Sequence, residues 1–236
     1  MQTEHRYLER RSQIEHYFDR TAVQAWERLT SNAPVGRIRA TVRAGRDRMR
    51  ENLLSWLPAR MDGLRLLDAG CGTGALAQVA AERGAHVVAI DLSPTLVNLA
   101  RERHRLAAHA MTGRIDFRSG DMLDEALGTF DHVVAMDSLI HYDTPDIVRA
   151  LTRLSQRTRG SMLFTFAPRT PLLAVMHRVG RLFPRSDRSP ALEPQAEPAL
   201  REALVTSLGP LGWQEGRTER VASGFYTSQA WEWSKQ

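Results

Sequence analysis

The stretch that decides the fold is residues 64–74, Leu-Arg-Leu-Leu-Asp-Ala-Gly-Cys-Gly-Thr-Gly. Its first half is short and leucine-rich, which is typical of a buried strand. Three glycines then follow at single-residue spacing, and glycine lets the backbone turn sharply because it has no Cβ. We therefore predict a strand over residues 64–68, a tight turn over residues 70–74 and a helix that begins near Ala75. A ligand could touch the main chain of such a turn.

Asp68 stands before the glycines and completes the pattern D-x-G-x-G-x-G. Dinucleotide sites use G-x-G-x-x-G and place a pyrophosphate at the helix N-terminus, where Asp68 would repel it. An acid here can meet the ammonium of a methionine moiety, while amides at the helix start bind its carboxylate. The pattern resembles the first motif of class I S-adenosylmethionine-dependent methyltransferases; a plain turn in another α/β protein is the alternative. We assign to cofactor binding Asp68, Gly70, Gly72 and Gly74.

Two later strands provide further cofactor candidates. The strand over residues 86–91 ends in Asp91, and an acid roughly 20 residues beyond a glycine-rich turn commonly receives ribose hydroxyls. Leu92 follows it and could pack on the adenine. A third strand, 114–118, leads to Asp121 and Met122. We expect the Asp121 carboxylate to accept the exocyclic amine of adenine and Met122 to cover the ring.

The remaining pattern predicts an α/β fold, a Rossmann-like seven-stranded class I methyltransferase sheet with helices on both faces. Residues 1–34 would form an N-terminal helical arm that acts as a lid, and residues 35–236 the core. The core would include a helix over 35–56, an inserted helix and loop over 168–198 on the substrate side, and a last helix over 200–208. A terminal hairpin over 212–221 and 224–233 would insert its final strand antiparallel.

Composition limits the class of protein. The chain has 236 residues, 42% hydrophobic and 25% charged, which favours one well-cored domain. A single cysteine, Cys71, excludes an internal disulfide and favours a reducing compartment. No His/Cys cluster has zinc spacing, so we predict no protein-bound metal. No apolar run could span a bilayer and no secretory signal opens the chain, so we expect a cytoplasmic location. The net charge of +5 permits a nucleic acid, acidic lipid or small acid as partner.

The strand over residues 130–136 leads to the carboxyl edge of the sheet, where open α/β sheets place their chemistry. Adenine amino methyltransferases often carry an Asn/Asp-Pro-Pro-aromatic run at this point, and this chain does not. It carries His141, which of the eight histidines is the one expected at this edge. We take His141 as the catalytic candidate.

Four segments carry a closer resemblance: residues 136–142, 163–171, 181–188 and 223–229. They are similar to the magnesium-protoporphyrin O-methyltransferase family, and the resemblance covers nearly the whole chain. It implies methyl transfer from S-adenosylmethionine to a propionate of magnesium protoporphyrin IX in chlorophyll and bacteriochlorophyll biosynthesis. The products would be the monomethyl ester and S-adenosylhomocysteine, and magnesium would enter only as part of the substrate.

The resemblance also guides the remaining assignments. His141 would orient the acceptor carboxylate or approach the magnesium, and both roles stay open. The arm departs from the family at residues 29–31, Leu-Thr-Ser, so we place Tyr17 over the cofactor instead. We assign Met136 to cofactor binding. The residues that we assign to substrate binding are Phe18, His141, Arg169, Met176 and Tyr226.

The implied partners are magnesium protoporphyrin IX and a magnesium chelatase subunit, with no nucleic acid. The implied location is cytoplasmic with peripheral contact to the photosynthetic membrane. Three alternatives are carried forward: an RNA methyltransferase, a methyltransferase of another small carboxylic acid, and a catalytically silent binding protein. An RNA methyltransferase should bind its substrate with a steep dependence on salt.

Overall fold

The computed structural model describes residues 2–17, 19, 36–107, 112–169 and 192–235. Phe18, Met176, most of the predicted arm beyond Asp19 and most of the predicted 168–198 insertion lie outside these residues.

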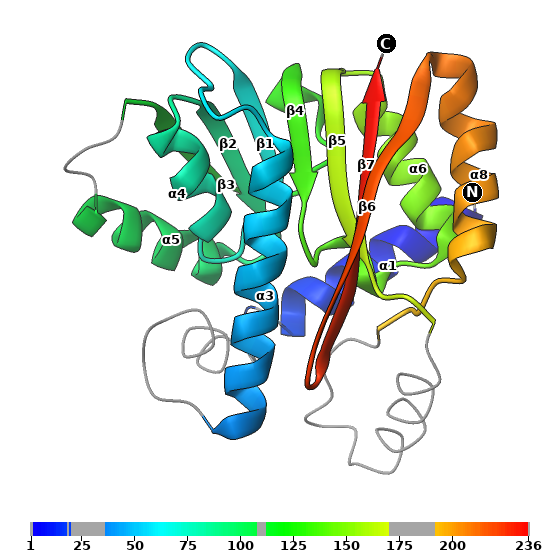
Figure 1. Cartoon of the computed structure of the whole chain (residues 1–236), viewed down its shortest axis with the longest axis horizontal. Coiled ribbons are helices and arrows are strands. Elements are labelled where there is room, and N and C mark those ends of the chain that lie inside the picture. The colour runs from blue at the N-terminus through cyan, green and yellow to red at the C-terminus, as the bar shows by residue number, and fades with distance from the viewer. Residues whose placement is uncertain (1, 18, 20–35, 108–111, 170–191, 236) are drawn as a thin grey trace.

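A single mixed sheet forms the centre of the molecule, with strand order β3-β2-β1-β4-β5-β7-β6 (Figure 1). The first five strands are parallel, and β7 is inserted antiparallel between β5 and β6. This order confirms the predicted seven-stranded sheet; β5 starts three residues earlier than the predicted 161. The strands are β1 Arg65–Ala69, β2 His86–Asp91, β3 Arg114–Ser119, β4 Phe130–Ala135, β5 Thr158–Phe166, β6 Trp213–Ser223 and β7 Tyr226–Lys235.

Helices cover both faces of this sheet, as predicted (Figure 1). One face is covered by α3 Arg37–Trp56, α4 Ala75–Glu82 and α5 Pro94–Ala107, and the other by α1 Gln2–His16, α6 Thr144–Ser155 and α8 Glu197–Leu208. Short 3-10 helices occupy Glu125–Leu127 (η3), Leu139–His141 (η4) and Gly209–Leu211 (η6). Sequence reasoning missed α6, although Asp143 caps it by accepting from the Asp146 amide and Pro145 lies in its first turn.

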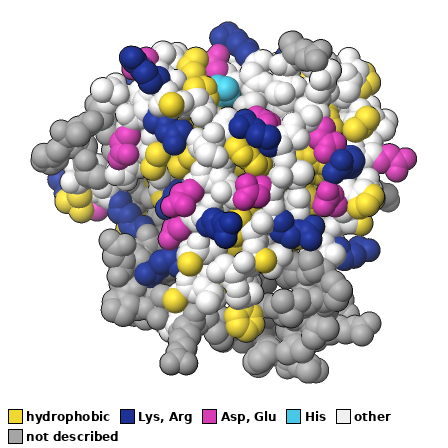
Figure 2. Space-filling view, in the orientation of Figure 1, with side chains coloured by type: hydrophobic (Ala, Val, Ile, Leu, Met, Phe, Trp, Pro, Cys, Tyr) yellow, Lys and Arg dark blue, Asp and Glu magenta, His cyan; other side chains and the backbone are white. Residues whose placement is uncertain are grey.

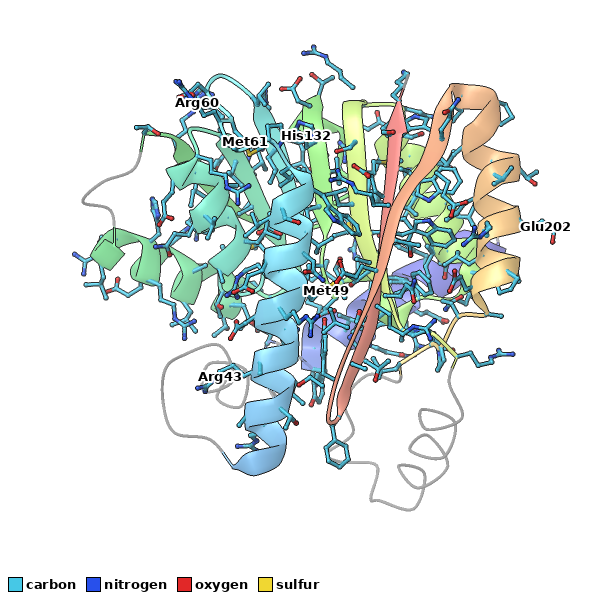
Figure 3. The ribbon with its side chains drawn as sticks, viewed as in Figure 1. Arg43, Met49, Arg60, Met61, His132 and Glu202 are labelled. Carbon is cyan, nitrogen blue, oxygen red and sulfur yellow. The ribbon has the colours of Figure 1, made fainter. Side chains whose placement is uncertain are left out.

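Alternating strand residues divide the core into two layers. In β1, Leu66 packs with α3 and α4 whereas Leu67 packs with α6 on the opposite face. Met49 is fully buried, and Figure 3 shows it pointing from α3 toward the sheet. The same alternation decides on which side of the sheet each residue at the carboxyl edge points.

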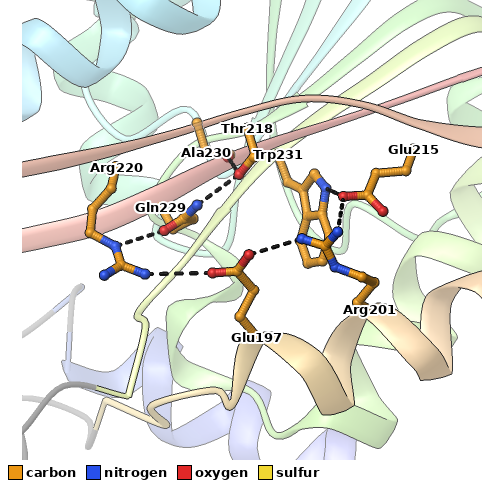
Figure 4. A network of polar contacts seen from close by, with 8 residues as sticks. All are labelled: Glu197, Arg201, Glu215, Thr218, Arg220, Gln229, Ala230 and Trp231. Atoms are coloured by element: carbon orange, nitrogen blue, oxygen red, sulfur yellow. Dashed lines mark hydrogen bonds and ion pairs between the residues drawn. The ribbon is translucent and has the colours of Figure 1, made fainter.

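The β6–β7 hairpin is attached to α8 by a polar network drawn in Figure 4. Arg201 pairs with Glu197 at 2.9 Å and with Glu215 at 2.9 Å, and its guanidinium lies 5.1 Å from the centre of the Trp231 ring. Because Trp231 is fully buried, these contacts cover the outer edge of the core. Figure 2 shows basic and acidic side chains interspersed over the visible face of the described residues. Within the described part of the chain, no helix has the length and apolar character needed to cross a membrane.

The glycine turn has the conformation that the sequence predicted. Gly70, Gly72 and Gly74 have φ values of 89°, 53° and 79°, a region that disfavours side chains. The amides of Gly70 and Cys71 both donate to the Ile90 carbonyl, at 2.8 and 3.0 Å, which ties the turn to the end of β2. Gly74 begins α4, and a Cβ there would lie 2.9 Å from the Phe117 ring.

We predict that Gly74→Ala destabilises the protein more than Gly212→Ala does. Gly212 has nearly the same φ, 81°, but a Cβ there meets nothing within 4 Å. Gly212→Ala should therefore lower the free energy of unfolding only through the strain of a positive φ, by about 1 kcal/mol. Gly74→Ala adds a steric overlap with the Phe117 ring and should lower the free energy of unfolding by roughly 1–3 kcal/mol more. Urea unfolding of both variants checks this; equal losses would show that the close approach to Phe117 does not matter.

Candidate functional site

A cavity lies at the carboxyl edge of the parallel strands and is closed on one side by α1. Its walls come from five parts of the chain: α1, the glycine turn, the β2–α5 junction, the turn after β3 and the turn after β4. The lining residues are Tyr7, Ile14, Gly70, Gly72, Ile90, Asp91, Leu92, Leu96, Gly120, Asp121, Met122, Asp137, Ser138, His141 and Tyr142. The structure thus brings together six predicted cofactor residues, Gly70, Gly72, Asp91, Leu92, Asp121 and Met122, with the catalytic candidate His141.

Asp91 is held rigidly at the end of β2. Its Oδ2 accepts from the Gly72 amide at 2.8 Å, and its Oδ1 accepts from the Ser93 amide at 2.9 Å. Burial raises the pKa of this carboxyl, whereas these amides oppose the rise. A carboxylate oxygen has two lone pairs, so each can still accept a ligand hydroxyl. Asp91 therefore joins the glycine turn to the cavity wall.

Asp68 does not line the cavity, which differs from its predicted contact with a bound cofactor. The strand alternation directs its side chain toward α4, where the Ala77 amide donates to it. Its Oδ2 is buried with no hydrogen-bond partner among the described residues. Burial, followed by the nearby Asp91 carboxylate, raises the pKa of Asp68 to about 7. Gly74 is likewise outside the lining residues and serves the packing of α4.

The α1 arm covers the cavity through Tyr7 and Ile14, whereas Tyr17, the predicted covering residue, is not among the lining residues. Tyr7 and Ile14 are seven residues apart, a spacing that places both on one face of a helix. The Tyr7 ring stacks on Tyr142 at 5.4 Å between ring centres, and the Arg149 guanidinium lies 4.5 Å from its centre. That helical spacing was the signal that could have selected Tyr7 over Tyr17.

Asp121 connects the arm to the floor of the cavity. Its Oδ1 accepts from the Tyr7 hydroxyl at 3.1 Å and from the Leu123 amide at 2.9 Å. Its Oδ2 accepts from Arg11 at 3.0 Å. Asp121, predicted to accept the adenine amine, therefore lies in the cavity wall with both oxygens already bonded to α1.

Two more contacts attach the arm at its ends. The Arg10 guanidinium pairs with Glu193 and donates to the His141 carbonyl at 2.8 Å. Asp19 accepts from the Thr95 amide at 3.2 Å and from the Ser93 hydroxyl at 3.1 Å, in the first turn of α5. The arm therefore contacts both the cofactor side and the β4 side of the cavity.

The turn after β4 supplies His141 and a residue that sequence reasoning passed over, Asp137. His141 ends η4 and is 5% exposed, so its environment is largely protein. Asp137 has a positive φ of 53° and its side chain is 4% exposed. Met136, assigned to the cofactor, packs instead with α3 and α4, because the β4 alternation directs it to the face opposite the cavity.

Two assigned substrate residues lie outside the cavity wall. Arg169 is exposed after β5, and its amide donates to the Gln195 carbonyl at 2.8 Å. Tyr226 is buried at the start of β7 and its hydroxyl donates to Asp137 Oδ1 at 3.1 Å. Among the described residues, no group of three or more His, Cys, Asp or Glu side chains could hold a metal ion.

Comparison with known proteins places this chain in a family. The model described as magnesium-protoporphyrin IX methyltransferase C-terminus matches residues 135–235, and a methyltransferase-domain model matches residues 66–160. The magnesium-protoporphyrin O-methyltransferase of Rhodobacter capsulatus is 48% identical over 96% of this chain and 97% of that protein. The chain belongs to the magnesium-protoporphyrin O-methyltransferase family.

Solved structures of this family agree with the fold. The crystal structure of magnesium protoporphyrin IX methyltransferase from Synechocystis PCC 6803 with bound SAH superposes with a TM-score of 0.82 at 27% identity. That match covers 95% of this chain and 99% of the other. The same enzyme with bound SAM gives a TM-score of 0.78, at 23% identity over 96% and 97% of the two chains. The predicted class I methyltransferase fold and the predicted family are both confirmed.

The raised pKa of Asp68 predicts a pH-dependent stability. Because the folded pKa lies above the ordinary value of 3.8, the folded state binds more protons between pH 4 and pH 7. The stabilising contribution of the protonated Asp68 carboxyl is complete below pH 4 and is lost as the pH rises to about 7. Relative to Asp68→Asn, the wild-type free energy of unfolding should fall by on the order of 4 kcal/mol across this window.

Urea unfolding of both proteins at several pH values measures this difference. Asp62→Asn is the matched control, since Asp62 is an exposed carboxylate paired with Arg60. Parallel stability profiles for the wild type and Asp68→Asn would contradict the prediction.

The arm contacts predict a graded effect at Tyr7. Tyr7→Phe keeps the ring that lines the cavity and loses only the hydroxyl bond to Asp121, so S-adenosylhomocysteine affinity should fall by ~3-fold or less. Tyr7→Ala removes the ring and its stacking on Tyr142, and affinity should fall by ~10-fold or more. Calorimetric titration measures both values. Equal losses in the two variants would assign the effect to the hydroxyl alone.

Proposed function

We propose that this chain transfers a methyl group from S-adenosylmethionine to one propionate of magnesium protoporphyrin IX, giving the monomethyl ester and S-adenosylhomocysteine. The observation that carries the proposal is one cavity in which the glycine turn, Asp91 and His141 meet. Family membership supports the choice of substrate, because the relatives carry the name of this reaction.

The donor set of the cavity fits S-adenosylmethionine. Leu92 and Met122 provide apolar walls for the adenine ring, and the Asp91 oxygens retain lone pairs for the ribose hydroxyls. Asp121 can accept the adenine amine only by sharing its oxygens with Tyr7 and Arg11. When bound, the cofactor supplies an electrophilic methyl group on a sulfonium. Asp68 would act behind the turn, where it accepts from α4, and not through direct contact.

The acceptor needs orientation more than activation. A propionate carboxyl has a pKa of about 4, so it is already ionised at neutral pH and needs no strong general base. The protein's task is then to hold the carboxylate oxygen in line with the methyl carbon and the sulfur. Such alignment can supply roughly 7–11 kcal/mol of the barrier reduction.

His141 is the residue that we assign to this alignment. It lies in the cavity wall, on a turn to which Arg10 is bonded through the His141 carbonyl. An imidazole N–H can donate to the acceptor carboxylate, which is the simpler of the two roles left open by the sequence. The alternative role, approach to the substrate magnesium, uses the same side chain in its neutral form.

The substrate side is argued from α3 and the tip of the hairpin. The tip lies against α3, since a Cβ at Gly224 would overlap Thr41. Phe225 at this tip is 51% exposed and offers an apolar surface to a flat macrocycle. Arg43 of α3 points away from the hairpin (Figure 3) and is therefore not part of this surface. In this proposal residues 1–34 act as the arm, residues 168–198 flank the substrate, and exposed Arg169 meets a propionate.

We also propose that a magnesium chelatase subunit delivers the substrate and that the protein contacts the photosynthetic membrane peripherally. The net charge of +5 is compatible with an acidic partner surface of either kind.

His141→Ala should lower kcat by roughly 100-fold while changing S-adenosylhomocysteine affinity by less than ~3-fold, because orientation of the acceptor is lost and the cofactor walls remain. His132→Gln is the matched control. His132 lies at the opposite end of the sheet (Figure 3), with Nδ1 2.8 Å from the Ser161 hydroxyl. Steady-state kinetics and calorimetry separate the two effects. A parallel loss of cofactor binding in His141→Ala would argue against this role.

The proposal itself is tested by incubating the purified protein with S-adenosylmethionine and magnesium protoporphyrin IX. Mass spectrometry should detect one added methyl group, and metal-free protoporphyrin in a parallel reaction shows whether magnesium is recognised. Absence of the ester, with cofactor binding intact, would overturn the substrate assignment and direct attention to RNA or another small acid.

A further inference from the structure

Asp137 is the one non-glycine residue with a positive φ among the described residues. It lies two residues after the end of β4, lines the cavity, and has a side chain that is only 4% exposed. A left-handed conformation costs free energy for any residue with a Cβ, although Asp and Asn tolerate it best. A buried charge in this conformation needs several contacts to hold it.

Contacts from three separate elements hold Asp137. Thr165 of β5 accepts from the Asp137 amide at 2.7 Å and donates to Oδ1 at 3.2 Å. Arg46 of α3 pairs with Oδ2 at 2.7 Å, with 19% of its own side chain exposed. From β7, the Tyr226 hydroxyl donates to Oδ1 at 3.1 Å and the Ser228 hydroxyl lies 3.4 Å from it. Both the backbone and the carboxylate of Asp137 are therefore fixed.

The approach of α3 to β7 makes the Arg46 contact possible. Gly45, the residue before Arg46, faces the Tyr226 ring so closely that a Cβ would overlap it. Tyr226 then lies between the helix and Asp137. The residue that we assigned to substrate contact is thus part of the support behind the cavity wall.

The next residue transmits this support to the rest of the site. Ser138 packs on the glycine turn, because a Cβ at Gly70 would overlap the Ser138 Cβ. The chain then enters η4, which ends at His141. Any displacement of Asp137 would therefore change the spacing between the glycine turn and His141.

We propose that Arg46 and Asp137 form a positioning pair for methyl transfer, which holds the turn over residues 137–141 against Gly70 so that His141 faces the acceptor correctly. This inference rests on the proposed methyl transfer. Replacing a buried ion pair by a neutral pair of similar size often leaves stability unchanged, so stability alone does not account for the charge. Because the acceptor is a carboxylate, Arg46 also neutralises the charge of Asp137 that would otherwise repel it.

The test is a comparison of Asp137→Asn, Arg46→Met and the double variant. Asn tolerates the left-handed conformation, so Asp137→Asn changes the charge and spares the backbone. Each single change leaves one buried charge without its counter-charge and should lower Tm. The double variant should regain most of the lost Tm and bind S-adenosylhomocysteine within ~3-fold of wild type, while its kcat stays ~100-fold lower.

The matched control is the double variant Arg217→Met/Glu232→Gln. This pair, at 2.6 Å, lies on the same hairpin, and Arg217 also donates to the Trp56 carbonyl of α3 at 2.9 Å. Neither residue lines the cavity. The control therefore loosens the junction between α3 and the hairpin without touching Asp137, and its kcat should stay within ~3-fold of wild type.

A second readout does not depend on turnover. With histidine labelled in the ring, the NMR signals of His141 should shift in the Arg46→Met/Asp137→Asn variant, and the signals of the remote His132 should not. Any one of three results would overturn the positioning role. These are a wild-type kcat in this variant, an equal loss of kcat in the control, and unchanged His141 signals. A wild-type protein that forms no ester would instead overturn the proposed function, while the NMR comparison would still decide the positioning of His141.

Discussion

The structure depends on the connection between the glycine turn and the end of β2. Two amides of the turn donate to one carbonyl, that of Ile90, and a third donates to the Asp91 side chain. These bonds use backbone groups that only a tight, positive-φ turn can present together. They bring the ends of β1 and β2 to one edge, so the glycine turn, Asp91 and Leu92 line the same cavity.

The opposite wall of that space is assembled from distant parts of the chain. The arm contributes two residues from α1, and the turn after β4 is held by α3, β5 and β7. The part of the cavity wall around the glycine turn and β2 is local in sequence, whereas the wall around the turn after β4 is not. This division agrees with the two family models, of which the one specific to magnesium-protoporphyrin methyltransferases begins at residue 135.

The local half was therefore the part that sequence reasoning could predict. Strand periodicity and glycine spacing correctly indicated the seven strands and the turn, and the cofactor candidates Asp91 and Leu92 line the cavity. Asp68 and Met136 stand at the ends of their strands but are not among the lining residues, because the alternation of side chains turns both toward the α3 and α4 side of the sheet. The contacts of Asp137 could not be predicted, since its partners lie 28 to 91 residues away in sequence, on α3, β5 and β7.

The position of β7 has a consequence for the order in which the molecule can be completed. This strand comes last among the described strands, yet it lies inside the sheet between β5 and β6. During synthesis strands β1 to β3 can pair while the C-terminal hairpin is still within the ribosome. Until Tyr226 and Ser228 emerge, however, the carboxylate after β4 lacks two of its hydrogen-bond donors. A nascent chain could thus form the glycine turn and β2 side of the cavity well before the turn after β4 is fully held, so the complete cavity depends on the last strand.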